Sequence, residues 1–235
     1  MSLRVVGASV QGPAHARAGE RNQDAWYARA GRTGALAVVA DGMGSRPAAR
    51  EGANAAVAAC RAAFRDWAPS PTGNGEDLVR LIEVLWRLRL GQTPSRDAAT
   101  TCLVCALRPD GSGVALQLGD GLLGILDASG VFTAVSPERD GFSTTTLALG
   151  VPHGLRDWII EPLGQFPPGA ALLLATDGVA DDLVPEKRSG FLRWVVEEIG
   201  ASVSPSRALG RALRTWPVPR HLDDKTVVAI WEPVR

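Results

Sequence analysis

Three segments of the chain combine a continuous apolar run with a carboxylate at one end. They are residues 35–41, 171–177 and 223–231. A short apolar run bounded by turn residues predicts a strand that is buried on both faces. The first two runs end in Asp and the third begins with it, so antiparallel placement of the third brings the carboxylates to one end of one core. A carboxylate where a buried strand surfaces is unfavourable unless it meets a partner or a cation.

A fourth carboxylate is placed by a predicted hairpin. The residues from Asp24 to Ala30 alternate and include aromatics, as strands do, and a short Gly-bounded loop joins them to Ala35. If Ala30 pairs with Ala35, the register continues to the far end of the hairpin. Asp24 then lies directly opposite Asp41. Because opposed like charges destabilise a sheet, either a cation lies between them or the register is shifted by one residue.

The remaining hydrophobic pattern separates helices from strands. Apolar positions recur at three- and four-residue steps over 53–67 and 78–88, which predicts two helices with one buried face each. Because strands and helices come in groups, we do not expect a doubly wound parallel sheet. We expect an α+β fold, a single domain over residues 1–235, in which an antiparallel β-sandwich of two sheets is flanked by helices as four αββα layers. The other predicted strands are 3–10, 100–107, 112–118, 122–126 and 131–135, the other helices 187–199 and 205–215, and the long loops 11–23 and 136–156.

Charge and hydropathy exclude several classes of partner. The 25 Lys and Arg residues balance 25 Asp and Glu residues and are scattered, so no bulk field attracts nucleic acid or an anionic membrane. No segment approaches the roughly 20 apolar residues of a membrane span, and the N-terminus has no charged leader. We expect a cytoplasmic monomer that binds neither nucleic acid nor membrane.

The candidate ligands favour a hard cation. Cys102 and Cys105 lie three apart in a predicted strand and therefore face opposite sides, so we interpret them as structural thiols. The three histidines are widely spaced. Carboxylates without His or Cys partners select Mg²⁺ or Mn²⁺, and several together indicate two ions of the kind that promote phosphoryl transfer. Neither a Walker phosphate loop nor a nucleophile elbow is present, which leaves hydrolysis by a metal-activated water.

The Asp-Gly pairs differ in what they predict. Gly42, after Asp41, is a candidate carbonyl ligand because glycine lets the backbone approach an ion. For Asp120 a plain hairpin turn and a peripheral metal ligand are equally compatible with the spacing. Asp181 and Asp182 are expected in the first turn of a helix, where negative charge suits the dipole.

Short motifs spanning nearly the whole chain carry a family resemblance. In order they are His15-Ala-Arg-Ala-Gly-Glu-Arg-Asn-Gln-Asp24, Val39-Ala-Asp-Gly-Met-Gly-Ser45 with Arg50-Glu-Gly52, Thr100-Thr101, Gln117-Leu-Gly-Asp-Gly121, Leu174-Ala-Thr-Asp-Gly178 and Asp223-Asp-Lys-Thr226. Each motif is weak alone, and jointly they are specific. The chain resembles the bacterial form of the metal-dependent serine/threonine protein phosphatases of type 2C (the PPM family).

The resemblance implies a binuclear Mn²⁺ or Mg²⁺ centre at one end of the sandwich. Asp41 resembles the carboxylate that bridges both ions, and Gly42 the residue that supplies a carbonyl. Asp177 and Asp223 resemble the ligands of the first ion. Asp24 resembles the acid that holds metal-bound water.

Other positions follow the family pattern less closely. Asp120 resembles a ligand of a third, weaker ion of bacterial members. Gln23 stands where the family often has Glu, which implies weaker retention of the second ion. Met43 replaces a His that many eukaryotic members use as a suspected general acid, so leaving-group protonation falls to metal-bound water or to His15.

The family's phosphate-binding Arg precedes the position of Asp24. Arg17 fits the His-x-Arg-x-Gly pattern of one bacterial subgroup, whereas Arg21 is closer in sequence. We favour Arg17, with His15 beside it, as the substrate-binding pair, since Arg binds phosphate with a two-pronged hydrogen bond.

The resemblance implies an enzyme of signal transduction that hydrolyses phosphoserine or phosphothreonine in proteins, opposed by a Ser/Thr kinase. The water would be activated by two ions, with no covalent intermediate. One alternative is a weak or inactive phosphatase-like scaffold or regulator. Another is a hydrolase of small phosphate esters. Retention of Asp24, Asp41, Asp177 and Asp223 favours the active enzyme.

Overall fold

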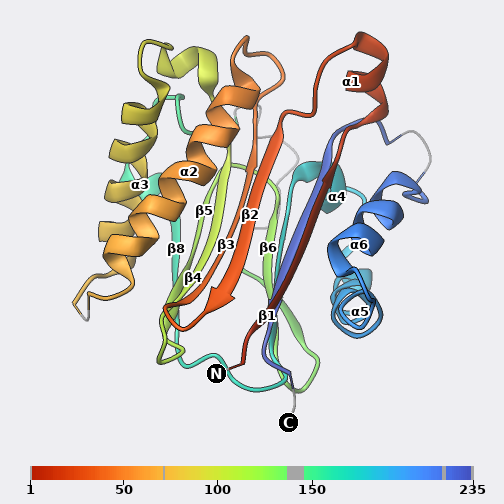
Figure 1. The fold of residues 1–235 in the computed structure, drawn as a ribbon. Coiled ribbons are helices and arrows are strands. Elements are labelled where there is room, and N and C mark those ends of the chain that lie inside the picture. Colours follow the sequence, from red (N-terminus) through yellow and green to blue (C-terminus); the bar gives the residue numbers. More distant parts are fainter. Residues whose placement is uncertain (1, 71, 137–145, 219–220, 234–235) are drawn as a thin grey trace.

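The sandwich has the predicted layers. The computed structural model describes residues 2–70, 72–136, 146–218 and 221–233. Two five-stranded sheets pack face to face, and helices cover both outer faces (Figure 1). All pairings within the two sheets are antiparallel, which confirms the expected αββα arrangement.

One sheet is covered by two long helices. Its strands, in spatial order, are β2 (Asp24–Gly31), β3 (Gly34–Asp41), β4 (Cys102–Leu107), β5 (Gly113–Leu118) and β8 (Ile159–Leu163). Helix α2 (Ala49–Trp67) is rich in alanine, which favours helix and lets it lie close to the sheet. Helix α3 (Gly75–Leu90) begins at a capping box in which Asn74 and Asp77 each accept the other's backbone N–H.

The second sheet is covered by helices from the C-terminal third of the chain. Its strands, in spatial order, are β1 (Arg4–Val10), β10 (Lys225–Trp231), β9 (Ala171–Ala175), β6 (Leu122–Leu126) and β7 (Phe132–Ala134). Its outer face packs against α5 (Pro185–Trp194), the π-helical turn Val195–Ile199 and α6 (Pro205–Arg214). A separate apolar cluster fills the space between the two sheets. Cys102 and Cys105 belong to clusters on opposite faces of their sheet, as the strand period predicts.

The strand registers bring the carboxylates together. Asp24 pairs with Asp41 across the β2–β3 hairpin, which confirms the unshifted register. Strand β10 runs antiparallel to β9, so the start of β10 and the end of β9 lie at the same end of the sandwich. That end also carries α1 (Pro13–Ala18) and α4 (Asp177–Ala180) (Figure 1).

Some expectations were wrong. The predicted loop 11–23 contains α1, for which Pro13 at the start and a left-handed Gly19 at the end are sequence signals. Strand β8 was not predicted, and none of its five residues is fully buried. Asp181 and Asp182 follow the short helix α4 and do not lie in a first helical turn.

Smaller elements complete the described chain. Residues 95–98 and 155–157 form 3₁₀ turns, and a bridge from Thr100 to Leu149 anchors the later part of the predicted loop 136–156. Residues 137–145 of that predicted 136–156 loop lie outside the described residues. Within the described part of the chain, no helix has the length and apolar character needed to cross a membrane.

Candidate metal centre

A cavity of about 220 Å³ opens at the carboxylate end of the sandwich. We call it the carboxylate cavity. Its lining includes most of the predicted site, namely His15, Asp41, Gly42, Asp120, Asp177 and Asp223, together with Met43, Gly44, Ser45, Thr101 and Thr146. Asp24 and Arg17 are not among the lining residues. Five acidic or carbonyl ligand candidates from four separate parts of the chain therefore meet at one hollow.

Each carboxylate is positioned by the end of an element. Asp41 is the last residue of β3, and Asp177 begins α4 directly after β9. Asp223 precedes β10. Asp120 lies in the β5–β6 turn, where Gly119 and Gly121 both have positive φ, the conformation that favours glycine. Asp120 accepts a hydrogen bond from Thr146 at 3.2 Å. Asp120 therefore lies in the turn between β5 and β6 and also lines the cavity.

Asp24 is buried between the two sheets next to the cavity. Its Oδ2 accepts hydrogen bonds from Thr176 Oγ1 at 3.0 Å and from Thr226 Oγ1 at 2.6 Å. Its Oδ1 is buried and meets no hydrogen-bond donor among the described residues. Burial and the charge of Asp224 outweigh these hydrogen bonds and raise the pKa of Asp24 to about 7.

The pKa values of Asp41 and Asp177 are also raised, because both carboxyl groups are buried close to other acidic groups. Burial raises the pKa of Asp41 well above its ordinary value, and the charges of Asp24 and Asp177 raise it further. Burial also raises the pKa of Asp177 to about 6. The two carboxyl groups interact directly, and this interaction favours retention of a proton on Asp41. Asp177 Oδ1 is buried and has no donor among the described residues.

These observations fit a bound divalent cation. Some of the buried carboxylate oxygens lack hydrogen-bond donors within the described part of the chain, and the carboxyl groups lie so close together that they retain protons. A divalent cation that replaces these protons would stabilise the carboxylates. The donor set is all oxygen, which suits Mg²⁺ or Mn²⁺.

Gly42 occupies a place where no side chain fits. A Cβ on this residue would stand 2.5 Å from the carbonyl oxygen of Ala49, at the start of α2. Its backbone N–H donates to the carbonyl of Gln23, and it forms a bridge with Thr100. Gly42 therefore lets the β3–α2 turn close tightly beside the cavity.

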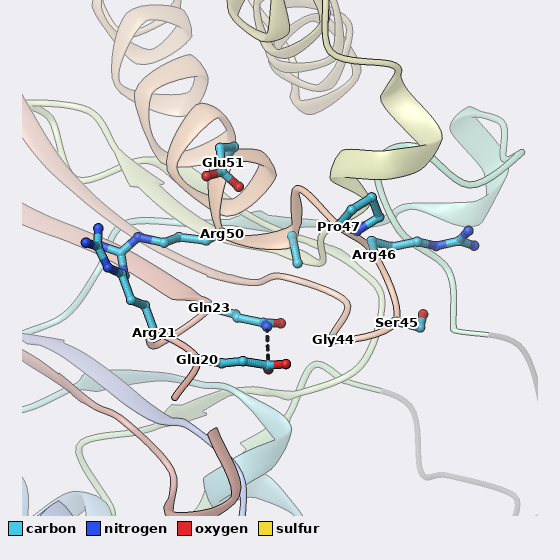
Figure 2. Close-up of a pocket in the computed structure, with 10 residues that line it drawn as sticks. Glu20, Arg21, Gln23, Gly44, Ser45, Arg46, Pro47, Arg50 and Glu51 are labelled. Carbon is cyan, nitrogen blue, oxygen red and sulfur yellow. Dashed lines mark hydrogen bonds between the residues drawn. The ribbon is translucent and has the colours of Figure 1, made fainter. Parts of the chain in front are cut away.

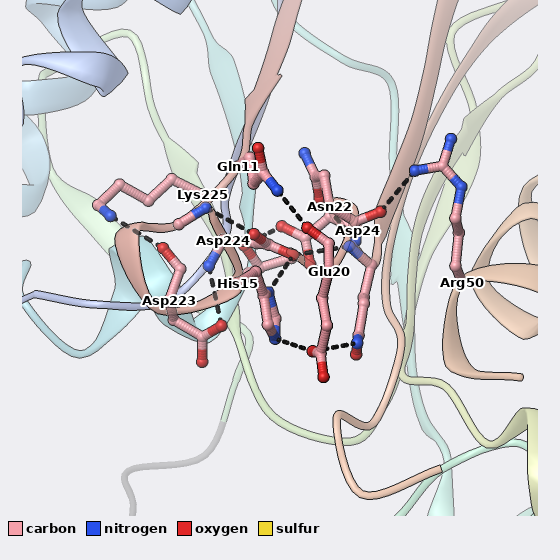
Figure 3. Close-up of polar contacts among 12 residues, drawn as sticks. Gln11, His15, Glu20, Asn22, Asp24, Arg50, Asp223, Asp224 and Lys225 are labelled. Atoms are coloured by element: carbon pink, nitrogen blue, oxygen red, sulfur yellow. Dashed lines mark hydrogen bonds and ion pairs between the residues drawn. The ribbon is translucent and has the colours of Figure 1, made fainter. Parts of the chain in front are cut away.

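Asp224 organises the neighbouring loop, a role that sequence analysis missed (Figure 3). Its Oδ1 accepts the Gly12 N–H at 2.6 Å and its Oδ2 the Gln23 N–H at 2.6 Å. His15 Nδ1 lies 2.9 Å from the same Oδ2. His15, Asp223 and Asp224 are close enough to suggest a metal site. Because both Asp224 oxygens are already engaged, we interpret Asp224 as an anchor of the loop and not as a ligand.

The neighbouring carboxylates favour the protonated form of His15 at the cavity. Burial lowers the pKa of His15, but the hydrogen bond to Asp224 and the charges of Asp224, Asp223 and Glu20 outweigh it, so the net pKa is raised above 6.5.

Removal of the Asp224 carboxylate should destabilise the fold. In Asp224→Ala the N–H groups of Gly12 and Gln23 lose their acceptors, each at about 1–3 kcal/mol, so we expect a loss of about 3 kcal/mol. Urea denaturation at pH 7 measures it. The control is Asp66→Ala, an exposed site on α2 where little change is expected. A loss below about 1 kcal/mol for Asp224→Ala would contradict the anchoring role.

The two candidate phosphate-binding arginines lie outside the carboxylate cavity. Arg17 is exposed on α1, two residues after His15. Arg21 lines a neighbouring pocket, as does Gln23. Gln23 Nε2 donates to Glu20 at 3.4 Å, and Gln23 Oε1 is buried without a donor among the described residues.

Comparisons with known proteins agree with this geometry. The family model described as protein phosphatase 2C matches residues 11–216. A search of curated proteins gives no match. Among solved structures, the chain is similar to PppA, a regulatory component of T6SS in Pseudomonas aeruginosa, with 23% identity, a TM-score of 0.69 and 98% of each chain covered.

Two further solved structures are serine/threonine phosphatases. The enzyme PstP/Ppp of Mycobacterium tuberculosis is 21% identical, with a TM-score of 0.68 and 100% of each chain covered. A PstP catalytic domain in complex with two manganese ions is 23% identical, with a TM-score of 0.63 and 97% of each chain covered. These likenesses establish the shared fold, and the family model covers most of the chain. The chain belongs to the protein phosphatase 2C family.

Proposed function

We propose that this protein is an active phosphoprotein phosphatase that hydrolyses phosphoserine and phosphothreonine. The observation that carries the proposal is the meeting of Asp41, Asp177 and Asp223 at one cavity, with buried carboxylate oxygens that lack donors among the described residues. The whole chain, residues 1–235, would act as one catalytic domain.

The proposed ligand set follows the elements that end at the cavity. Asp41 would bridge two ions, Gly42 would contribute its carbonyl, and Asp177 and Asp223 would hold the first ion. Asp120 would hold a third, weaker ion. When bound, Mn²⁺ or Mg²⁺ would supply an acidified water as the nucleophile and positive charge for the phosphoryl oxygens.

The other residues act on protons and on the phosphate. Asp24 is fixed by Thr176 and Thr226 and offers its unpaired Oδ1 as an acceptor for water. His15, held by Asp224, would protonate the serine or threonine oxygen as the P–O bond breaks. Arg17, which lies on α1 together with His15, would donate hydrogen bonds to the non-bridging oxygens of the substrate phosphate.

We expect manganese-dependent hydrolysis of p-nitrophenyl phosphate and of phosphothreonine peptides. The reason is that a cation would replace the protons that the cavity carboxylates otherwise retain and would supply the acidified water for hydrolysis. Phosphate release is measured with metal-stripped protein, with and without added Mn²⁺. Turnover that persists in excess chelator would contradict the proposal.

An inactive scaffold is the competing interpretation. Loss of a core carboxylate is the usual route to such a protein, and here the sequence retains Asp24, Asp41, Asp177 and Asp223. Gln23 is the only departure in its favour, and its amide lies in the adjacent pocket. We further propose that the protein is a bacterial, cytoplasmic and monomeric enzyme of signal transduction, which removes phosphate groups that a Ser/Thr kinase adds.

A further inference from the structure

A second pocket, of about 470 Å³, lies directly beside the carboxylate cavity (Figure 2). Gly44 and Ser45 line both hollows, so the two are neighbours on either side of the β3–α2 turn. We call the second hollow the arginine pocket, because three of its ten lining residues are arginines. Its lining residues are Glu20, Arg21, Gln23, Gly44, Ser45, Arg46, Pro47, Ala49, Arg50 and Glu51.

The arginines of this pocket carry unneutralised charge. In Figure 2 the side chains of Arg21 and Arg50 approach one another, whereas Arg46 extends away from them, on the side of Ser45. Within the described part of the chain, none of the three forms an ion pair with a carboxylate. Arg50 donates to the backbone carbonyl of Asn22 at 2.8 Å, which fixes its direction. Like charges held at one pocket attract an anion.

Two further observations point to a missing anionic partner. Arg46 Nε is buried and meets no acceptor among the described residues. Arg50 stands in the first turn of the 19-residue helix α2, where the helix dipole disfavours a cation. No side chain from the described residues caps that helix end. An oxyanion bound between Arg21 and Arg50 would neutralise the charge of these two guanidinium groups.

Among the residues that the structure describes, neither of the two glutamates that line the pocket forms an ion pair with Arg21, Arg46 or Arg50. Glu20 Oε2 is 3.4 Å from Gln23 Nε2 and 3.7 Å from His15 Nε2, so it is committed to other residues. Glu51 lies apart from the Arg21 and Arg50 side chains in Figure 2.

We propose that the arginine pocket binds a second oxyanion of the substrate polypeptide, a phosphoryl group or a carboxylate near the phosphorylated residue that enters the carboxylate cavity. This inference rests on the proposed function and names its preferred substrates as multiply phosphorylated or acidic segments. An extended chain advances roughly 3.3–3.6 Å per residue, so a group within a few residues of the target reaches the adjacent pocket.

The test uses three phosphothreonine peptides that differ at one flanking position, which carries Ala, Asp or a second phosphothreonine. In separate sets of peptides, the variable residue lies at each position from roughly three residues before to three residues after the target phosphothreonine. Wild-type protein with Mn²⁺ should show a kcat/KM about tenfold higher for the best-placed anionic peptide than for its Ala counterpart. A response to both anions identifies a general oxyanion site, and a response to the phosphopeptide alone identifies a phosphate site.

Variants assign the preference to the pocket. In Arg50→Gln the ratio of kcat/KM for the anionic peptide to kcat/KM for its Ala counterpart should fall to near one. In Arg50→Lys the ratio should be intermediate, because Lys keeps the positive charge but lacks the two-pronged hydrogen bonding of the guanidinium group. The matched control is Arg65→Gln, on the same helix at its opposite end, which should keep the wild-type ratio. Circular dichroism confirms folding of each variant.

Fluorescence anisotropy with metal-stripped protein measures the same preference as binding. Preferential binding without any turnover would refute the proposed function and leave the pocket assignment standing. A wild-type ratio near one at every position, or an Arg50→Gln ratio equal to wild type, would overturn the inference.

Discussion

Asp41→Asn should abolish phosphatase turnover while leaving the protein folded. The amide cannot bridge two cations, because it carries no charge. Loss of an outer-shell partner of a metal costs roughly 10–100-fold, so loss of a bridging ligand should cost more. The metal-free fold should tolerate the change, since the buried Asp41 carboxyl already favours its neutral form and an Asn amide can also donate to Asp177. Steady-state hydrolysis of p-nitrophenyl phosphate with Mn²⁺ measures the effect.

Asp177→Asn should behave in the same way, because Asp177 begins α4 just after the buried strand β9 and lines the same cavity. Asp66→Asn, which removes one exposed carboxylate from α2, provides the matched control and should retain wild-type rates. Thermal unfolding of metal-stripped samples separates lost chemistry from lost structure. An Asp41→Asn enzyme with near wild-type activity would show that this carboxylate has no part in the reaction.

Metal-stripped protein should lose stability as the pH rises from about 4 to about 7. Burial raises the pKa of Asp24 from 3.8 to about 7 and that of Asp177 from 3.8 to about 6. Between these values the folded state holds protons that the unfolded state has released, so the free energy of unfolding falls with increasing pH. The loss is on the order of a few kcal/mol, or a melting temperature lower by on the order of 10 °C.

Manganese should reverse this trend. Cation binding requires the ionised carboxylates, so the stabilisation by Mn²⁺ should grow as the pH rises from 5 to 8. Differential scanning calorimetry at pH 5 and pH 8, with chelator and with Mn²⁺, gives the four melting temperatures. Equal melting temperatures for the metal-stripped protein at both pH values would mean that the pKa values of the buried carboxyl groups are not raised in the folded state.

The part of the fold that was predictable follows from backbone periodicity. Apolar runs ending in Asp41 and Asp177 identified two central strands, because only strands buried on both faces are continuously apolar. The register of the β2–β3 hairpin followed from its loop length, so Asp24 could be placed opposite Asp41 by counting. These local rules were sufficient to identify the carboxylate end of the sandwich.

The supporting contacts were not predictable, because they join segments far apart in sequence. Asp224 anchors Gly12 and Gln23 across more than 200 positions, and nothing near Asp224 in the sequence marks that role. Thr176 and Thr226 were seen only as parts of motifs, yet they fix Asp24 between the sheets. The arginine pocket depends on where α2 begins relative to the loop after α1, which is a property of tertiary packing.

Anomalous diffraction from crystals soaked in Mn²⁺ tests the central claim most directly. If buried carboxylates converge to hold divalent cations, manganese peaks will lie in the cavity lined by Asp41, Asp177 and Asp223, and Asp41→Asn crystals will lose them. A fully soaked wild-type crystal with no manganese peak in that cavity would contradict the account.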